Sequence, residues 1–387
     1  MMKAGWESKP LADMCQIKPP KVEARNRISA KDLVSFVPME DLGIDQKILV
    51  PTQTRPLEDV AGSYTYFADG DVLLAKITPC FENGKLGIAE NLTNGIGFGS
   101  SEYIVFRPSS AVNKEWLYYF LSRESFRTEG AERMSGAVGH KRVSKEFIES
   151  YLIPAPPLPE QHRIVAILDE AFDGIATART NAEQNRQNAR ALFESHLQSV
   201  FTARGEGWVV TTIDELSTNL DSKRIPITKG VRTSGEYPYY GASGIVDYVA
   251  DYIFEGDTLL ISEDGANLLA RSTPIAFSVS GKYWVNNHAH ILKFEDMATQ
   301  RFVEFYLASI RLDEYITGAA QPKLNQKALN SIPIPIPIAV GEQAAIVNRI
   351  ESLQNKTQHL ESLYQQKLAA LDELKKSLLH QAFSGQL

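Results

Sequence analysis

The sequence predicts an α+β protein in which two mixed α/β domains, in a pseudo-two-fold arrangement, are joined by two long helices that form an antiparallel coiled coil. The first observation is an internal repeat, because residues 135–201 align without a gap with residues 317–383. Glu160-Gln161 falls on Glu342-Gln343, which sets the shift at 182 residues (342 − 160). The second is that each copy ends in a long polar segment whose apolar residues recur at helical spacing. A domain followed by a helix therefore occurs twice.

Length and composition are typical of a globular chain of two or three domains. Of its 387 residues, 43% are hydrophobic and 22% are charged. Cys15 and Cys80 are too few for a disulfide framework and lack the spacing of metal ligands. We expect a cytoplasmic protein that does not contact a membrane, because no apolar run reaches the roughly 18–20 residues of a span and a signal-peptide core is missing. The net charge of −7 weakly disfavours nonspecific binding of polyanions but does not exclude a local basic surface.

Within each domain, short runs of β-branched and aromatic residues bounded by glycine, asparagine or proline predict strands. These strands are expected at residues 71–77, 103–106, 258–262 and 289–294. One helix per domain is expected, at about 113–128 and 298–312. The domains are then 1–155 and 204–336, and the helical regions are 156–203 and 337–387.

The helical segments carry the strongest periodic signal, because their apolar residues alternate spacings of four and three in a heptad pattern. The seam of the first segment is rich in alanine and that of the second is rich in leucine, and small residues facing large ones favour close packing. Asn185 also falls on the seam, where it either fixes the register or is an ordinary solvated residue. The residues expected to pair the helices are Ile164, Leu168, Ala171, Ile175, Ala178, Leu192, Ile346, Ile350, Leu353, Leu360, Leu371, Leu374 and Leu378.

The short link Thr202–Gly207 predicts the direction of this pairing. A helix over residues 160–201 is roughly 60 Å long at 1.5 Å per residue, whereas a domain the size of the second is about 35–40 Å across. Parallel pairing would require the chain to travel back along the whole helix, which so short a link and so compact a domain do not allow. The helices are therefore expected to run antiparallel, with one domain at each end.

The sequence contains no convincing catalytic motif. It has no phosphate-binding Gly-x-x-x-x-Gly-Lys-[Ser/Thr] loop, no Asn-Pro-Pro-[Phe/Tyr] of amino-methyltransferases and no His-Glu-x-x-His metal site. Asp71 and Asp257 are duplicated acids, but each follows a glycine at the start of a strand, where an aspartate that caps a turn is the better interpretation. We therefore expect a protein that is not an enzyme, with no catalytic residue, no metal site and no cofactor of its own.

Two duplicated basic loops precede the helical regions. Residues 135–145 contain a histidine, two lysines and an arginine but no acid, and residues 317–327 contain two lysines with glutamine and asparagine. Lysine and arginine supply contacts to phosphates, while histidine, glutamine and asparagine can read base edges. A solvated surface loop is the ordinary fate of such a stretch, but its occurrence at the same place in both copies favours a function.

Aromatic, amide and cationic side chains elsewhere in both domains complete a candidate nucleic-acid interface, although each of them alone is more often a turn or strand-edge residue. The candidate DNA-binding residues are Lys76, Thr78, Asn83, Lys85, Ser101, Tyr103, Ser135, Gly136, Gly139, His140, Lys141, Arg142, Lys145, Tyr239, Tyr240, Ser243, Asn267, Arg271, Asn286, Asn287, His288, Gln321, Lys323, Asn325 and Lys327.

Four segments of the chain resemble the DNA-specificity subunit of type I restriction–modification systems. They are Gly70–Lys85, Pro157–Gln161, Tyr239–Gly244 and Gln381–Leu387. The likeness spans essentially the whole chain, and although each motif is loose, their duplicated order is specific. Gly341 stands where the family usually has a proline, which leaves the start of the second helix open.

The resemblance implies a non-catalytic subunit whose two target-recognition domains each read one half of a bipartite, asymmetric sequence in double-stranded DNA. It implies that the helices set the half-site spacing and dock two methyltransferase subunits, which bring S-adenosylmethionine and methylate adenine. Restriction subunits that translocate DNA would complete the complex. Two other classes stay open: a stand-alone enzyme, which the missing motifs disfavour, and a coiled-coil scaffold or tandem binding module unrelated to restriction.

Overall fold

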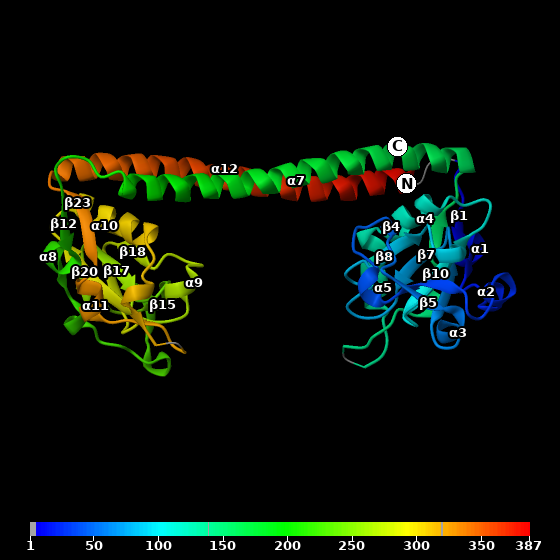
Figure 1. The fold of residues 1–387 in the computed structure, drawn as a ribbon, viewed down its shortest axis with the longest axis horizontal. Helices are drawn as coiled ribbons and strands as arrows, with labels where there is room; N and C mark the ends of the chain where they lie inside the picture. The colour runs from blue at the N-terminus through cyan, green and yellow to red at the C-terminus, as the bar shows by residue number, and fades with distance from the viewer. Residues whose placement is uncertain (1–4, 138, 319) are drawn as a thin grey trace. The chain divides into compact units, whose positions relative to one another are not determined.

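The computed structural model of the chain describes residues 5–137, 139–318 and 320–387. The chain forms two compact units, Met1–Asn181 with Lys367–Leu387, and Ala182–Gln366. Each unit contains one α/β domain and a part of each long helix (Figure 1). The predicted α+β class and the two repeated domains are confirmed. Among the described helices, none combines the length and the apolar character needed to cross a membrane.

The domain of the first unit is built on two mixed sheets. Its strands are β1 (Ser8–Pro10), β2 (Cys15–Ile17), β3 (Leu33–Val37), β4 (Ile48–Leu49), β5 (Gln53–Pro56), β6 (Thr65–Ala68), β7 (Val72–Ala75), β8 (Leu86–Ala89), β9 (Ile96–Gly99), β10 (Tyr103–Pro108) and β11 (Leu152–Pro154). Its helices are α1 (Leu11–Met14), α2 (Val22–Arg27), α3 (Leu57–Val60), α4 (Lys114–Leu121), α5 (Glu124–Glu132) and α6 (Lys145–Ser150). The sheets have the strand orders β2-β10-β7-β8-β4 and β5-β3-β9-β6, and β1 pairs with β11. β7 and β8 are buried along their whole length, as expected for strands covered on both faces.

The domain of the second unit repeats this topology. Its strands are β12 (Trp208–Thr212), β13 (Ser217–Asn219), β14 (Ser234–Gly241), β15 (Gly244–Val249), β16 (Phe254–Glu255), β17 (Thr258–Ser262), β18 (Ala276–Val279), β19 (Lys282–Val285), β20 (Ala289–Phe294), β21 (Ile316–Thr317), β22 (Lys323–Leu324) and β23 (Pro333–Pro337). Its helices are α8 (Ile213–Leu216), α9 (Asn267–Ala270), α10 (Met297–Ser309) and α11 (Gln326–Asn330). Its sheets have the orders β13-β20-β17-β18 and β15-β14-β19-β16. They match those of the first domain, including the parallel pair β3 with β9 and β14 with β19, except that the first domain adds the edge strand β4, which pairs in parallel with β8. The duplication therefore extends through the domains.

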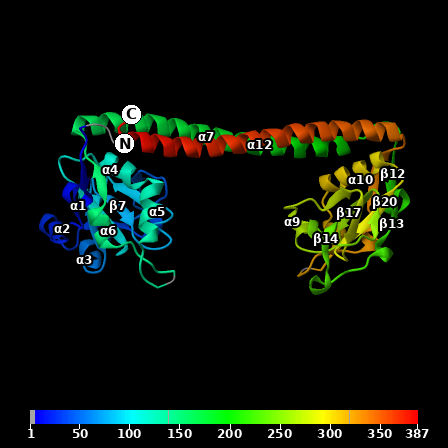
Figure 2. The same ribbon diagram turned by 180° about the vertical axis from the view of Figure 1, so that it is seen from behind.

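The long helices are α7 (Leu158–Thr202) and α12 (Val340–Ser384), each of 45 residues. In the first unit, Arg163 donates to the Leu387 carbonyl at 2.7 Å and Arg179 pairs with Asp372. In the second unit, Arg186 donates to Gln365 at 2.6 Å, and Arg190 lies 3.8 Å from Glu361. As the residue numbers rise along α7, those of the partner residues on α12 fall. The predicted antiparallel pairing is therefore confirmed in each unit (Figures 1 and 2).

The heptad assignment of the seam is wrong in part. Leu192, Leu360 and Leu374, which the heptads place between the helices, are 55%, 39% and 47% exposed, and Asn185 is also exposed. One run of covered positions along α7 is 164, 168, 171, 175, 178, 182, 186, 189, 193, 197 and 200, and positions 161, 165, 167, 169, 172, 183, 196 and 201 are covered as well. The ten steps of this run across 36 residues (200 − 164) average 3.6, the period of a straight α-helix, which drifts away from a 3.5-residue repeat by about 20° per heptad. Ile164, Leu168, Ile346 and Ile350 are all buried, and each shares a hydrophobic cluster with its domain and with residues at the end of the other helix.

Both domains have more helices than the single one expected. The predicted helix at 113–128 is interrupted, because Arg123 has an extended backbone (φ −64°, ψ 139°) that separates α4 from α5. The Arg123 side chain donates to the Phe120 carbonyl at 3.1 Å and so satisfies one of the free carbonyls at the end of α4. The strands predicted at 258–262 and 289–294 have those bounds, and α10 lies close to the helix predicted at 298–312.

The repeated Glu-Gln motif anchors each long helix to its domain. Gln161 is fully buried, accepts a hydrogen bond from the Asn113 amide at 2.9 Å and donates to the Ala111 and Pro156 carbonyls at 3.0 and 2.9 Å. Gln343 is 5% exposed, accepts from the Thr299 hydroxyl and donates to the Pro337 carbonyl, both at 2.7 Å. Because buried amides need partners, the glutamine explains why this motif recurs at both helix starts.

A phenylalanine near the end of each long helix packs against a helix of the adjacent domain. Phe383 of α12 packs against Trp116 and Phe120 of α4, with ring centroids 4.4 and 5.2 Å apart. Phe201 of α7 packs against Phe302 of α10 at 5.2 Å, and α10 lies beside the helix pair in the second unit (Figure 2). Each domain therefore holds the start of one long helix and the end of the other.

Candidate nucleic-acid interface

The basic loop of the first domain folds back on itself at the end of β7. Arg142 and Ser135 exchange backbone hydrogen bonds of 2.8 and 3.1 Å, which close the hairpin. The Thr78 amide donates to the Lys141 carbonyl at 3.0 Å. The loop is thereby fixed to the end of the central strand of the five-stranded sheet.

The basic loop of the second domain takes the same place at the end of β17. Here β21 and β22 form the hairpin. The Leu324 amide donates to the Glu263 carbonyl at 2.8 Å, and the Gly265 amide donates to the Pro322 carbonyl at 3.0 Å. The duplicated loops therefore occupy equivalent corners of the two domains.

A glycine makes each hairpin possible. Gly136 has φ +125°, and a Cβ added there would lie 2.9 Å from the His140 carbonyl oxygen. Gly318 has φ +86°, and its added Cβ would lie 2.5 Å from the Gln321 carbonyl oxygen. Side chains rarely adopt these φ values, and both distances are too short for a carbon atom. The two glycines are therefore required for the tight turn of each loop.

In the first domain an ion pair holds the hairpin. Arg142 donates to both carboxylate oxygens of Glu102, at 2.9 and 2.7 Å, and these hydrogen bonds lower the pKa of Glu102 in spite of its partial burial. Lys76 donates to the Ser101 carbonyl at 3.0 Å. The structure thus brings together segments 76–83, 100–102 and 135–142. Their exposed candidate residues are Asn83, Ser101, Ser135, Gly136, Gly139, His140, Lys141 and Arg142.

In the second domain three turns meet beside the hairpin. The Asn286 amide donates to the Tyr240 carbonyl at 3.0 Å, which joins the 286–288 turn to the turn between β14 and β15. His288 lies 2.9 Å from Asp264, whose turn pairs with the loop. The exposed candidate residues of this corner are Ser243, Asn287, His288, Gln321, Lys323 and Asn325.

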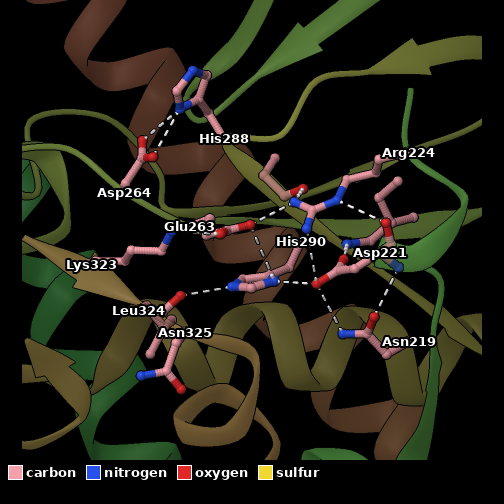
Figure 3. A network of polar contacts seen from close by, with 12 residues as sticks. Asn219, Asp221, Arg224, Glu263, Asp264, His288, His290, Lys323, Leu324 and Asn325 are labelled. Atoms are coloured by element: carbon pink, nitrogen blue, oxygen red, sulfur yellow. Dashed lines mark hydrogen bonds and ion pairs between the residues drawn. The ribbon is translucent and has the colours of Figure 1, made fainter. Parts of the chain in front are cut away.

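A buried polar network adjoins this second corner (Figure 3). His290 on β20 is 1% exposed, and its Nδ1 lies 2.5 Å from Asp221 Oδ2. Arg224 donates to Glu263 at 2.6 Å, and Lys323 of the loop lies 3.1 Å from the same carboxylate. Burial acts to raise the pKa of Asp221, but the hydrogen bond and charge of His290 outweigh it and the pKa is lowered overall.

This network has the composition of a metal site but does not fit a metal. The possible ligand atoms of Asp221, Glu263 and His290 lie within 4.8 Å of one another. However, Arg224 and Lys323 already neutralise the carboxylates, and both ring nitrogens of His290 are engaged. Because metal ligation needs a free lone pair on the imidazole, the cluster is an internal ionic network.

Several predicted contact residues are structural instead. Tyr103, Tyr239 and Asn286 are 4%, 1% and 8% exposed and cannot reach DNA. The Tyr103 hydroxyl donates to the Pro38 carbonyl at 2.7 Å, and Asn286 accepts from the His288 amide within its own turn at 2.8 Å. The aromatic and amide groups that suggested DNA contacts instead pack and form hydrogen bonds inside the domain.

Three further candidates satisfy backbone groups of their own domain. Lys85 donates to the Met39 carbonyl at 2.7 Å. Arg271 donates to the Leu307 and Ile310 carbonyls at 3.1 and 3.0 Å, near the end of α10. Asn267 donates to the Thr273 carbonyl at 3.0 Å. These side chains hold loops in place and are not directed at a ligand.

The remaining candidates lie at the margins of the two corners. Thr78 donates to Glu82 at 2.8 Å, and Tyr240 packs on Tyr283 with centroids 5.9 Å apart. Lys145 and Lys327 are exposed in the first turns of α6 and α11. Only the two lysines of this group present free surface next to the loops.

Sequence reasoning missed the acids that hold the loops. The loops themselves contain no acid, but Glu102 and Glu263 reach them from the ends of neighbouring strands. His290 was also missed, although a lone histidine within the apolar run Ala289–Phe294 could have signalled a buried polar contact.

The comparisons with known proteins agree with this geometry. The sequence model of a family described as type I restriction modification DNA specificity domain matches residues 3–185 and 205–369. The specificity subunit of the type I restriction enzyme EcoAI of Escherichia coli is 33% identical over 216 residues, which are 56% of this chain and 35% of that protein. The match thus spans about a third of that relative's length.

Two solved structures share the fold. A chain from a study of the assembly and conformational transition of a type I R-M system has a TM-score of 0.81 and 18% identity, with all of both chains covered. The HsdS subunit of Thermoanaerobacter tengcongensis has a TM-score of 0.67 and 17% identity, with 100% of this chain and 98% of that chain covered. At such low identity these likenesses show the fold alone.

Proposed function

Because the chain belongs to the type I restriction–modification DNA specificity family, we propose that it is the non-catalytic subunit that directs such a complex to its DNA sequence. The observation that carries the proposal is the duplicated corner: a glycine-dependent basic loop lies at the end of the central strand in both domains. Lys141 and Lys327 are exposed there and suit phosphates, while His140, Asn287 and Gln321 suit base edges.

Each domain reads one half of a bipartite target in double-stranded DNA. The two loops share their backbone form but differ in side chains, since His140 and Arg142 stand where the second loop has Pro322 and Leu324. Different side chains at the same position recognise different bases. The target is therefore asymmetric.

The long helices set the spacing of the half-sites and dock two adenine methyltransferase subunits. Four leucines of the helices are exposed and so available to such partners: Leu192, Leu360, Leu363 and Leu374. S-adenosylmethionine belongs to those partner subunits, and restriction subunits that translocate DNA complete the complex.

Methylome sequencing of the host with and without the gene tests this function. We expect N6-methyladenine to disappear from a single bipartite, asymmetric motif when the gene is removed. Methylation that does not change would contradict the proposal and favour a scaffold or binding module unrelated to restriction. Methyl transfer by the purified chain alone would contradict its non-catalytic role.

A lysine substitution tests the loop directly. Lys141→Ala in the assembled complex is expected to lower the affinity for target duplex and to reduce the slope of log affinity against log salt by about 0.9, the value for one lost phosphate contact. The control is Lys356→Ala on the exposed side of α12. An unchanged slope for Lys141→Ala would remove this loop from the interface. Lys141 is preferred to Arg142, whose loss would also release Glu102.

A further inference from the structure

The hairpin of β14 and β15 carries two neighbouring apolar side chains that both face solvent. Ile245 and Val246, the apolar tip of the hairpin, are 47% and 56% exposed. Consecutive residues of a strand point to opposite faces, so regular pairing would expose only one of them to the same side. The ladder shifts between Tyr239 and Tyr240 of β14, which leaves Val246 as an extra residue on β15. This β-bulge turns both side chains outward, and bulges are frequent where a side chain is aimed at a functional site.

Hydrogen bonds fix the hairpin to the corner that contains the basic loop. The buried Ser262, at the end of β17, donates through its hydroxyl to the Ala242 carbonyl in the turn of the hairpin. The next residue, Glu263, accepts from the Leu324 amide of the basic loop at 2.8 Å. The apolar tip and the basic loop are therefore held by adjacent residues at the end of the same strand.

The apolar tip also lies beside the turn that contains Asn286. A Cβ added to Gly241 would lie 2.9 Å from Val246 Cγ1 and 3.3 Å from Asn286 Nδ2, so both side chains lie close to this glycine. Asn287 and His288, which follow in the same turn, are exposed. The apolar tip is thus continuous with the polar side chains that suit base edges.

The chemistry of this surface indicates which part of a duplex it fits. Asp247, the acid of β15, pairs with Arg232 at 3.1 Å, and Lys323 of the same corner is exposed, so the surroundings of the tip favour a polyanion. The side chains of Ile245 and Val246 can neither donate nor accept a hydrogen bond. Among the groups that base pairs present in the major groove, the C5-methyl group of thymine is the apolar one, and apolar side chains contact it.

We propose that Ile245 and Val246 are specificity-determining residues that contact the methyl group of a thymine in the half-site read by the second domain. The proposal rests on the proposed function, under which each half-site contains an adenine to be methylated and therefore an A·T pair. In the first domain β5 pairs with β3 as β15 pairs with β14, but it begins with the exposed polar residues Gln53 and Thr54. The contact to a thymine methyl group through this strand therefore belongs to one half-site only.

Replacement of thymine by uracil tests the contact, because it removes the methyl group and leaves the hydrogen-bonding groups of the base unchanged. Competition binding is measured with the assembled complex and a duplex that carries the motif found by methylome sequencing, with each thymine of the motif replaced in turn. At the contacted thymine we expect binding to weaken about fourfold, the effect of one buried apolar carbon group. If the complex prefers its motif but no replacement weakens binding, this proposal is overturned and the proposed function stands. A complex without preference for the motif would overturn both.

Variants of the hairpin assign the methyl group to the apolar tip. The double variant Ile245→Ala with Val246→Ala is expected to bind the thymine and uracil duplexes equally, because the apolar partner of the methyl group is gone. Its discrimination at the other half-site should be unchanged, which shows that the chain is folded and assembled. The control is Val210→Ala, an exposed valine of β12 in the same domain, which should keep the preference for thymine. A double variant that keeps this preference would overturn the role of the apolar tip.

Discussion

At the scale of single residues, the buried glutamines are the clearest test of how the helices are anchored. Gln161→Ala removes one acceptor and two donors from buried backbone partners. Each unsatisfied buried group costs about 1–3 kcal/mol, so we expect the free energy of unfolding of the first unit to fall by at least that amount. Urea denaturation measures it, with Gln187→Ala on the exposed side of α7 as the control. Equal midpoints for the two variants would show that the anchor contributes nothing.

The loop glycines provide a second prediction at this scale. Gly136→Ala and Gly318→Ala place a Cβ within 3 Å of a carbonyl oxygen, so each loop must change its backbone. We expect weaker DNA binding by the complex, with little loss of global stability, because both loops lie at the surface. Gly62→Ala is the control, since Gly62 has no positive φ and has open space around its Cβ. Full binding by both test variants would contradict the importance of the hairpin form.

Residue types alone could not identify which candidates face solvent. Tyr239 and Lys141 both looked suitable for DNA, but Tyr239 is buried and Lys141 is exposed. Tyr239 lies in β14, where a one-residue change in register would reverse the face it occupies, whereas Lys141 lies in a loop outside the strands. The acid partners Glu102 and Glu263 come from segments far along the chain, which no local pattern reveals.

At the scale of elements, the helix pair follows the period of a straight helix. Leu368 is 7% exposed and Leu374 is 47% exposed, although the heptads assigned the seam to Leu374. We expect Leu368→Ala to destabilise the protein by roughly 2–4 kcal/mol, as for a buried leucine, and Leu374→Ala to change stability by less than about 1 kcal/mol. Thermal unfolding of the two variants decides between the patterns. A larger effect at Leu374 would restore the heptad assignment.

Elements with strong, uninterrupted patterns were predicted well, and those ended by a tertiary contact were not. The strands at 258–262 and 289–294 are apolar runs bounded by turns, so the local signal suffices. The break between α4 and α5 depends on Arg123, which donates to Phe120 and stacks on its ring at 3.9 Å. An arginine in a helix-forming stretch carries no local sign of a break.

At the scale of the whole molecule, the duplication predicted most of the architecture. The repeat with its shift of 182 residues gave two domains and two helices, and α7 and α12 begin at that same offset (340 − 158). The repeat could not predict the network around His290, because the first domain has no counterpart of that histidine. Features that differ between the copies are those that a repeat cannot predict.

A matched insertion in both helices tests their role as a ruler. Seven residues added after 181 in α7 and after 370 in α12, levels set by the pairing of Arg179 with Asp372, lengthen each helix by roughly 10 Å and rotate it by only about 20° from whole turns. We expect the methylated motif to gain about three base pairs between its halves, at 3.4 Å per base pair. Methylome sequencing of a host with the lengthened chain measures this.

The control for that experiment is an insertion in α7 alone. It leaves one helix longer than its partner, so we expect a loss of stability and no new spacing. A folded, active protein with two lengthened helices and the original motif would remove the ruler role. It would leave the reading of the half-sites untouched.

The anchoring of each long helix by a buried glutamine also has a mechanical consequence. Gln343 is held from two directions, by the Thr299 hydroxyl and the Pro337 carbonyl, so α12 cannot spin about its long axis unless both contacts break. Torque applied along α12 is therefore passed through Thr299 to α10 and through Pro337 to β23.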